Sequence, residues 1–217
     1  MSKVVIFGIQ DFAELAHYYL ENDSEHEVVA FSVNEEYMPE SKVFKGLPIV
    51  PFENIEQAYP PQDFEFFAPM APSKMNRVRE KTYLAIKAKG YELISYISSK
   101  ATLFDNVIGE NCFILENNTI QPFTSIGNNV ILWSGNHIGH HSTIKDHIMF
   151  TSQVVLSGHC IVENYSVIGV NSTIRDGLTI REGTFVAMAA SIIKSTEEWG
   201  MYKGNPAIKS TRSTIDF

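Results

Sequence analysis

The fold is decided by residues 108–192, which read IGENCFILENNTIQPFTSIGNNVILWSGNHIGHHSTIKDHIMFTSQVVLSGHCIVENYSVIGVNSTIRDGLTIREGTFVAMAASI. Every sixth residue of this stretch is large and apolar, without a break. A period of six matches neither the 3.6-residue turn of an α-helix nor the alternation of an ordinary strand. It indicates a β-helix whose coils have three six-residue sides, about 18 residues in all. The apolar row is Ile108, Ile114, Ile120, Ile126, Leu132, Ile138, Ile144, Phe150, Leu156, Val162, Ile168, Ile174, Ile180, Val186 and Ile192.

A second row, two residues before the apolar one, is usually small. Its members are Cys112, Thr124, Val130, Ser142, Val154, Cys160, Ser166, Ser172, Thr184 and Ala190. Glycine follows the apolar residue at 109, 127, 139 and 169, where we expect turns with unusual backbone angles. Because each coil buries its core only against its neighbours, we expect one cooperative rod.

The whole chain limits the classes of function that fit. It has 217 residues and a formal net charge of -8, which argues against nucleic acid or an anionic membrane surface as the main partner. Met1 to Val4 runs straight into a predicted strand and does not read as a signal peptide. No apolar stretch reaches the roughly 18 residues of a membrane span. We therefore predict a cytoplasmic protein.

The two cysteines, Cys112 and Cys160, both belong to the small inward row. Their separation is not a whole number of coils of about 18 residues, so the two thiols fall on different sides of the rod. We predict buried free thiols in a reducing compartment and no disulfide.

The N-terminal part has a different pattern. Apolar strands alternate with helical segments, which predicts a small parallel α/β sheet. The expected strands are 3–7, 28–33, 64–70 and 91–97, residues 48–51 close a short segment, and the expected helical segments are 14–20, 54–58 and 73–89. We therefore divide the chain into an α/β domain, residues 1–98, and a β-helix domain with a short C-terminal tail, residues 99–217.

The first strand leads into a turn that invites a nucleotide interpretation. A dinucleotide-binding turn has the pattern G-x-G-x-x-G at the start of a helix. This chain has only Gly8, with Gln10 and Ala13 at the other two positions, so the motif is weak. A plain strand-to-helix turn without a ligand explains it as well, and a full redox cofactor site is disfavoured.

Five of the seven histidines fall within one short stretch, at His137, His140, His141, His147 and His159. His140 lies two residues past the inward Ile138, so it should point outward. His141, His147 and His159 each lie three residues past an inward position. Since His141 and His159 are one coil apart, we expect them to stack at about 5 Å.

Histidine is the natural general base near neutral pH, so this exposed group is a candidate catalytic site. A polar surface that is rich in histidine by accident is the alternative. Metal binding is a third interpretation, because some β-helix enzymes hold zinc through three histidines across a subunit interface. Those enzymes need two histidines five residues apart and a third about two coils away. The five histidines here do not show that spacing, and we predict no metal.

Over nearly its whole length the chain resembles the two-domain sugar acyltransferases of the hexapeptide-repeat family. These include sialic acid O-acetyltransferases and bacillosamine-pathway-type N-acetyltransferases acting on nucleotide-linked 4-amino sugars. The resemblance lies in residues 5–8 (VIFG), in the coil containing His140, in residues 168–172 (IGVNS) and in residues 203–207 (KGNPA). It implies a Rossmann-like α/β N-terminal domain and an all-β left-handed parallel β-helix. It also implies a homotrimer with acetyl-CoA between adjacent rods and no metal cofactor.

The resemblance also implies roles for single residues. His140 is the expected catalytic base, and His141 stands where many members have an acidic residue that tunes this base. A neutral His141 could fix the tautomer of His140, and Asp146 or an acid of a neighbouring subunit could serve instead. Expected acetyl-CoA contacts are Met149, Gly158, Val170, Met188, Lys203, Gly204 and Pro206. Expected sugar-nucleotide contacts are Gln10, Asp11, Phe12, Asn34 and Glu35.

The sequence thus predicts an acetyl-CoA-dependent acetyltransferase that modifies a hydroxyl or an amine of a nucleotide-linked sugar for a surface glycan. The alternative is a non-catalytic β-helix scaffold that binds a nucleotide sugar or a protein partner. Neither the acceptor sugar nor the choice between O- and N-acylation follows from the sequence.

Overall fold

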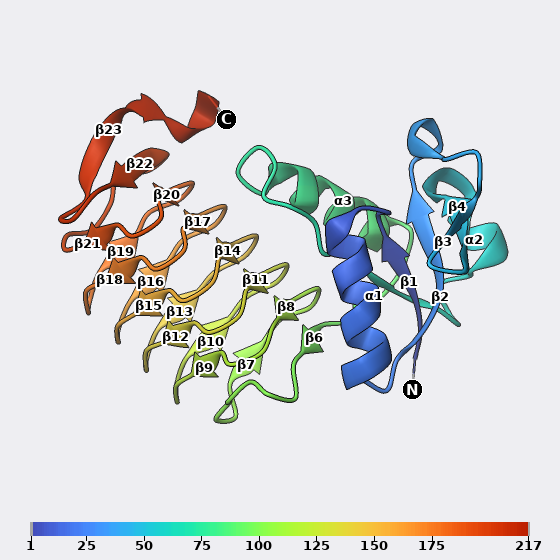
Figure 1. Ribbon diagram of the computed structural model, residues 1–217, viewed down its shortest axis with the longest axis horizontal. Helices are drawn as coiled ribbons and strands as arrows, with labels where there is room; N and C mark the ends of the chain where they lie inside the picture. The colour runs from blue at the N-terminus through green and yellow to red at the C-terminus, as the bar shows by residue number, and fades with distance from the viewer. Residues whose placement is uncertain (1, 217) are drawn as a thin grey trace.

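The computed structural model describes residues 2–216 and contains two packed parts, a small α/β sheet and a long rod of stacked coils (Figure 1). Met1 and Phe217, the outermost residues of the two predicted domains, lie outside the described residues.

The N-terminal sheet has the strand order β3-β4-β2-β1-β5. Strands β4, β2, β1 and β5 run parallel, and β3 forms an antiparallel hairpin with β4. Apolar side chains of α1 pack on one side of this sheet and those of α2 and α3 on the other. The elements are β1 (Lys3–Phe7), α1 (Asp11–Asp23), β2 (Glu27–Val33), β3 (Val43–Phe44), β4 (Leu47–Pro51), α2 (Ile55–Ala58), β5 (Glu65–Phe67) and α3 (Arg77–Ala88), with short 3-10 turns at Glu35–Tyr37 and Phe52–Asn54.

Two expectations for this part were wrong at their boundaries. The predicted helix 73–89 begins only at Arg77, because Lys74, Met75 and Asn76 all have positive φ. The predicted strand 91–97 is split. Leu93 makes an isolated bridge to Phe66, whereas β6 (Tyr96–Ile97) already pairs with the rod.

The rod has three parallel faces, and from β7 to β21 ladder partners in consecutive coils are 18 residues apart, as between Ser125 and Thr143. The first face contains β7 (Val107–Ile108), β10 (Ser125–Ile126), β13 (Thr143–Ile144), β16 (Ile161–Val162) and β19 (Thr179–Ile180). The second contains β6, β8 (Phe113–Ile114), β11 (Ile131–Leu132), β14 (Met149–Phe150), β17 (Val167–Ile168), β20 (Phe185–Val186), β22 (Gly200–Lys203) and the antiparallel β23 (Ile208–Ser213). The third contains β9 (Thr119–Ile120), β12 (His137–Ile138), β15 (Val155–Leu156), β18 (Thr173–Ile174) and β21 (Ser191–Ile192). This arrangement is consistent with a left-handed hexapeptide β-helix.

The two predicted inward rows form the core of the rod. All members of the apolar row except Ile108 are at most 2% exposed, and Ile108 packs partly buried against the same core. The small residues are also buried, including Cys112 and Cys160, which are free thiols on different faces, as predicted.

The turns of the rod share a left-handed backbone position that the glycine positions do not predict. From Ile108 to Val186, the third residue after each apolar position has φ between 54° and 80°, and Asp105, three residues after Thr102, has φ of 52°. These residues are Asp105, Asn111, Asn117, Phe123, Asn129, Gly135, His141, His147, Gln153, His159, Tyr165, Asn171, Gly177, Gly183 and Ala189. The expectation of unusual angles at Gly109, Gly127, Gly139 and Gly169 was wrong. A Cβ on Gly139 would lie 2.5 Å from the backbone N of Gly158, so close stacking of coils requires glycine there.

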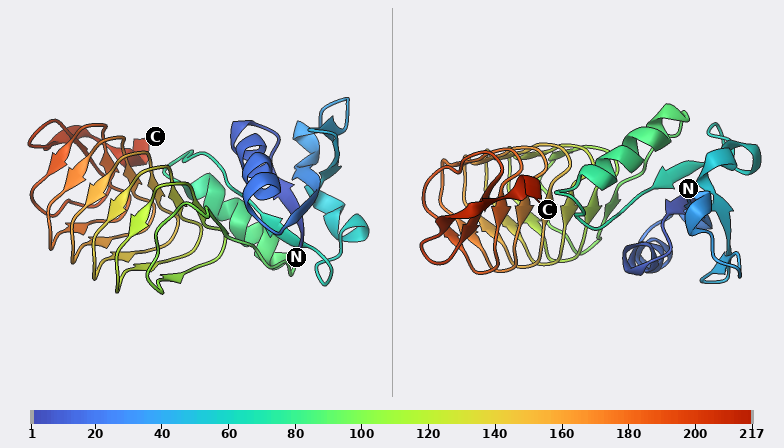
Figure 2. Two further views of the ribbon diagram at one scale, coloured as in Figure 1. Left: turned by 60° about the horizontal axis from the view of Figure 1, so that its bottom comes forward. Right: turned by 90° about the horizontal axis from the view of Figure 1, so that it is seen from above.

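The N-terminal part packs against the second face of the rod. Figure 2 shows this part, in blue to cyan, beside the end of the rod where the coils begin. Phe113, Ile131 and Met149 share one apolar core with β1, β2 and α1. Beside this core, the fully buried Arg79 of α3 donates to the backbone carbonyls of Met70 and Ile148 at 3.2 and 3.0 Å. Apolar burial and buried hydrogen bonds together fix the position of the N-terminal part relative to the rod.

Candidate functional site

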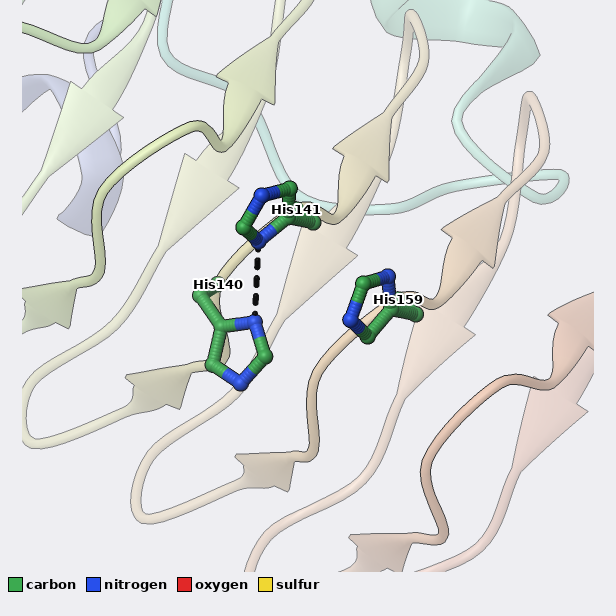
Figure 3. Close-up of side chains that lie close together, drawn as sticks. All are labelled: His140, His141 and His159. Atoms are coloured by element: carbon green, nitrogen blue, oxygen red, sulfur yellow. Dashed lines mark hydrogen bonds between the residues drawn. The ribbon is translucent and has the colours of Figure 1, made fainter.

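The histidine edge is the line of turns that joins the third face to the first, and it presents His140, His141, Gly158 and His159. The turn between β12 and β13 supplies His140 and His141, and the next coil supplies Gly158 and His159 (Figure 3). All three imidazoles are exposed. The phase of the repeat therefore placed His140 outward, as predicted.

The three rings of this edge face one another closely. His140 Nδ1 lies 3.0 Å from His141 Nδ1, so one of these nitrogens donates a proton and the other accepts it. The rings of His141 and His159 are stacked, with centroids 4.9 Å apart and planes inclined by 15°. This confirms the stacking predicted at about 5 Å. His140 lies across the pair, almost perpendicular to both rings.

The imidazole of His140 lies directly over Gly158. A Cβ on Gly158 would come within 2.8 Å of His140 Cε1 and 2.9 Å of His140 Nε2. Only glycine leaves room for the ring in this position. The backbone N–H of His140 also donates to Gln121 Oε1 at 3.0 Å, which fixes the turn. The sequence predicts neither of these contacts with His140; it places Gly158 only among the expected acetyl-CoA contacts.

Three histidine ligand atoms meet on this edge despite the spacing argument against metal. One nitrogen from each of His140, His141 and His159 lies within 4.8 Å of the other two. The spacing that predicts no metal applies to histidines that meet across a subunit interface. Three ligands from two neighbouring turns of one chain do not need that spacing.

His147 and Asp146 do not join this cluster. His147 is buried on the edge between the first and second faces, where its Nδ1 lies 2.9 Å from Asn129 Nδ2. Burial lowers the pKa of His147, against the opposing effect of Glu80, whose carboxylate is 3.5 Å from Nε2. Asp146 accepts a hydrogen bond from the backbone N–H of Asn128 at 2.6 Å. The suggestion that Asp146 tunes His140 is therefore not supported.

The predicted cofactor residues are divided between two edges of the rod. Gly158 belongs to the histidine edge. Val170 and Met188 lie on the edge between the second and third faces and are 38% and 74% exposed. Lys203, Gly204 and Pro206 continue this second edge, since Gly204 O accepts a hydrogen bond from the backbone N–H of Ser191 at 3.0 Å. The third face lies between the two groups.

Met149 is placed differently from the other predicted cofactor residues. Its side chain is 4% exposed and packs in the apolar core between the rod and the N-terminal part. A side-chain contact with acetyl-CoA is thus contradicted by burial. The repeat shows that Met149 points out of the rod, but it does not show which outward face another part of the chain covers.

The predicted sugar-nucleotide residues gather at one edge of the N-terminal sheet. Gln10 is the N-cap of α1, Asp11 and Phe12 begin the helix shortly after β1 ends, and Asn34 and Glu35 follow β2. Because β1 and β2 are parallel neighbours, both groups lie at the carboxyl ends of their strands. Phe12 also packs edge-to-face on Trp133 of the rod, with ring centroids 5.6 Å apart.

A feature beside the histidine edge was missed by the sequence analysis. Phe123 is 76% exposed, and its ring centroid lies 4.6 Å from that of His141. It helps line a hollow of about 550 Å³ with Phe104 and Val107, which are also exposed. Phe123 occupies the same position as His141 one coil earlier, so the repeat phase could have located it.

Comparisons with known proteins agree with this architecture. Residues 107–140 match the family model described as bacterial transferase hexapeptide (six repeats). An acyl-[acyl-carrier-protein]–UDP-N-acetylglucosamine O-acyltransferase from Sinorhizobium fredii is 28% identical over 116 residues, which is 50% of this chain. The match covers only 43% of that relative. The resemblance to hexapeptide-repeat acyltransferases is thus confirmed.

Two solved structures resemble nearly the whole chain. PerB from Caulobacter crescentus, in complex with CoA and GDP-perosamine, has a TM-score of 0.84 and 19% identity, covering 97% of this chain and 98% of that one. The acetyltransferase domain of PglB from Neisseria gonorrhoeae, in complex with acetyl coenzyme A, has a TM-score of 0.82 and 17% identity, covering 96% and 98%. At these identities the likeness is one of fold. Within residues 2–216, no helix combines the length and hydropathy that a membrane crossing requires.

Proposed function

We propose that this protein is an acetyl-CoA-dependent acetyltransferase that acylates a hydroxyl or an amine of a nucleotide-linked sugar, with His140 as the general base. The observation that carries the proposal is the exposed His140 ring, held over Gly158 with its Nδ1 against His141 Nδ1. The hexapeptide match and the sugar acetyltransferases with a similar fold support the class of reaction.

The His140–His141 contact suggests how the base is prepared. When His140 Nδ1–H donates to His141 Nδ1, the lone pair of His140 resides on Nε2. Nε2 then takes the proton of the acceptor hydroxyl or amine as that atom attacks the thioester carbonyl. The tetrahedral intermediate expels the CoA thiolate, which receives the proton from the imidazolium. In this scheme His141 supplies orientation rather than charge, in place of the usual acidic neighbour.

General-base catalysis of this kind is worth about 10²–10⁴ in rate. Alignment of donor and acceptor contributes further, because a bound pair reacts as if it were a single molecule. The edge formed by Val170, Met188 and the turn at Gly204 offers an exposed surface for the extended pantetheine arm. The exposed ammonium of Lys203 suits the phosphates of the nucleotide end.

We further propose that the N-terminal part is a Rossmann-like acceptor domain and that the active unit is a homotrimer. The convergence of residues 10–12 with residues 34 and 35 at one sheet edge supports the acceptor site. The division of the predicted donor contacts between two rod edges supports a site that two rods complete. The free buried thiols favour a reducing, cytoplasmic location.

The test is release of free CoA thiol from acetyl-CoA in the presence of a panel of nucleotide-linked amino sugars and free sugars. We expect acceptor-dependent release that falls by about 10²–10⁴ in His140→Ala. His17→Gln, a change on α1, is the matched control and should leave the rate unaltered. If no acceptor produces thiol and acetyl-CoA does not bind, the scaffold interpretation replaces the enzyme.

A further inference from the structure

We propose that His140, His141 and His159 form a binding site for a divalent transition-metal ion of the zinc type, and that the bound ion inhibits the protein. Binding follows from the geometry of the three rings alone. Inhibition rests on the proposed function of His140.

The ligand spacing is close to what such an ion needs. With Zn–N bonds of about 2.0–2.1 Å, nitrogens of a tetrahedral site are about 3.4 Å apart. The Nδ1 atoms of His140 and His141 are already 3.0 Å apart, and one ring nitrogen from each of the three histidines lies within 4.8 Å of the other two. A closure of about 1.4 Å completes the set. The stacked rings of His141 and His159 must tilt for this; both are exposed, and the neighbour that His141 must move against is the exposed ring of Phe123.

The chemistry of the donors selects the ion. Three imidazoles without a carboxylate suit zinc, copper or nickel, whereas calcium and magnesium require oxygen ligands. The solvent side leaves a fourth position for water. The backbone also restricts the site, because His141 and His159 both occupy left-handed turn positions in consecutive coils, with φ of 57° and 58°. Their Cα positions are therefore fixed by the rod.

The inhibitory effect follows from the same nitrogen pair. When Nδ1 of His140 gives its lone pair to the metal, the proton of the neutral ring resides on Nε2. Nε2 then has no free pair with which to accept the proton of the acceptor. The metal thus competes with general-base catalysis, and its removal by a chelator should restore turnover.

The variants should disturb the site without disturbing the rod. Asparagine tolerates the left-handed region and already fills the same turn position at Asn111, Asn129 and Asn171. His141→Asn and His159→Asn should therefore fold, which a thermal melt verifies. His17→Gln removes a histidine from α1 and serves as the matched control.

The experiment titrates chelator-treated full-length protein with Zn²⁺ in competition with a chromophoric chelator. We expect one ion per chain, at least about 10–100-fold weaker binding in His141→Asn and His159→Asn, and wild-type affinity in His17→Gln. Thiol release with and without Zn²⁺ is then compared within each variant. Unchanged Zn²⁺ affinity in His159→Asn would overturn the site. Site-specific Zn²⁺ binding in a protein that neither releases thiol with any acceptor nor binds acetyl-CoA would instead keep the site and refute the proposed function.

Discussion

The substitution Gly158→Ala tests whether the position of the His140 ring over Gly158 controls the rate of the reaction. A Cβ at this position would lie 2.8 Å from His140 Cε1, 2.9 Å from Nε2 and 3.2 Å from Nδ1. Carbon atoms pack at about 3.5–4.0 Å, so the imidazole must withdraw by about 1 Å. Gly158 does not have a positive φ, so the backbone accepts alanine, and we expect the free energy of unfolding to change by less than about 0.5 kcal/mol.

A displacement of about 1 Å at a reacting group costs about 10²-fold in rate. We therefore expect Gly158→Ala to lower kcat for thiol release by about 10²-fold, with a smaller change in the KM for acetyl-CoA. The loss cannot exceed the whole contribution of the base, about 10²–10⁴. A thermal melt of the same preparation separates displacement of the ring from unfolding.

The decisive control is a double-mutant cycle with His140→Ala. Without the imidazole the new methyl group has room, so Gly158→Ala should have little further effect on the residual turnover. An equal fold-loss in both backgrounds would show that Gly158 acts through acetyl-CoA rather than through His140. Full activity of the single variant Gly158→Ala would directly refute the proposal that catalysis requires the His140 ring to lie over Gly158.

Three further predictions concern other parts of the chain. Burial lowers the pKa of His147, so below about pH 6.5 the unfolded chain binds a proton that the folded chain does not bind. The free energy of unfolding should therefore fall as pH drops below about 6.5. In His147→Gln, the free energy of unfolding from urea titrations should depend less steeply on pH over this range. Hydrogen bonds from Ser99 and Tyr96 lower the pKa of Asp23 from 3.8 to about 2, so the stability that they provide is complete above 3.8 and is lost as pH falls through about 2. The difference between wild type and Asp23→Asn, about 1 kcal/mol after solvent screening, should shrink over that range in acid unfolding. Lys203→Ala should raise the KM for acetyl-CoA about tenfold with little change in kcat, as measured by initial rates.

The repeat predicted the rod well because one physical requirement recurs at every sixth residue. If one of these apolar side chains pointed away from the core, the free energy gained by burying it would be lost. Ile138 must therefore point inward, and this fixes the directions of His140 and His141, which lie two and three residues later. The same phase predicted the stack of His141 on His159. It did not predict the turn chemistry, because the left-handed position accepts Asn, Gln, Tyr and Ala as well as Gly. Composition therefore does not mark that position.

The sequence pattern also does not predict that the rings of His140, His141 and His159 converge. Two adjacent residues in a regular strand point to opposite faces, so neighbouring histidines would normally diverge. Here His141 has a positive φ, which breaks the alternation and brings its Nδ1 to within 3.0 Å of the Nδ1 of His140. That turn geometry, and not the spacing along the chain, creates both the candidate base and the candidate metal site.

The packing of the N-terminal part decides which histidines are available for chemistry. His147 has the same phase and the same left-handed backbone as His141 and His159. However, α3 covers the edge of the rod that carries His147, and the ring centroids of Tyr83 and His147 are 5.8 Å apart. Burial favours the neutral form of His147. On the histidine edge no element of residues 2–216 buries His141 or His159. The repeat thus supplies equivalent positions on every edge, and the packing of one helix buries His147 while His141 and His159 stay exposed.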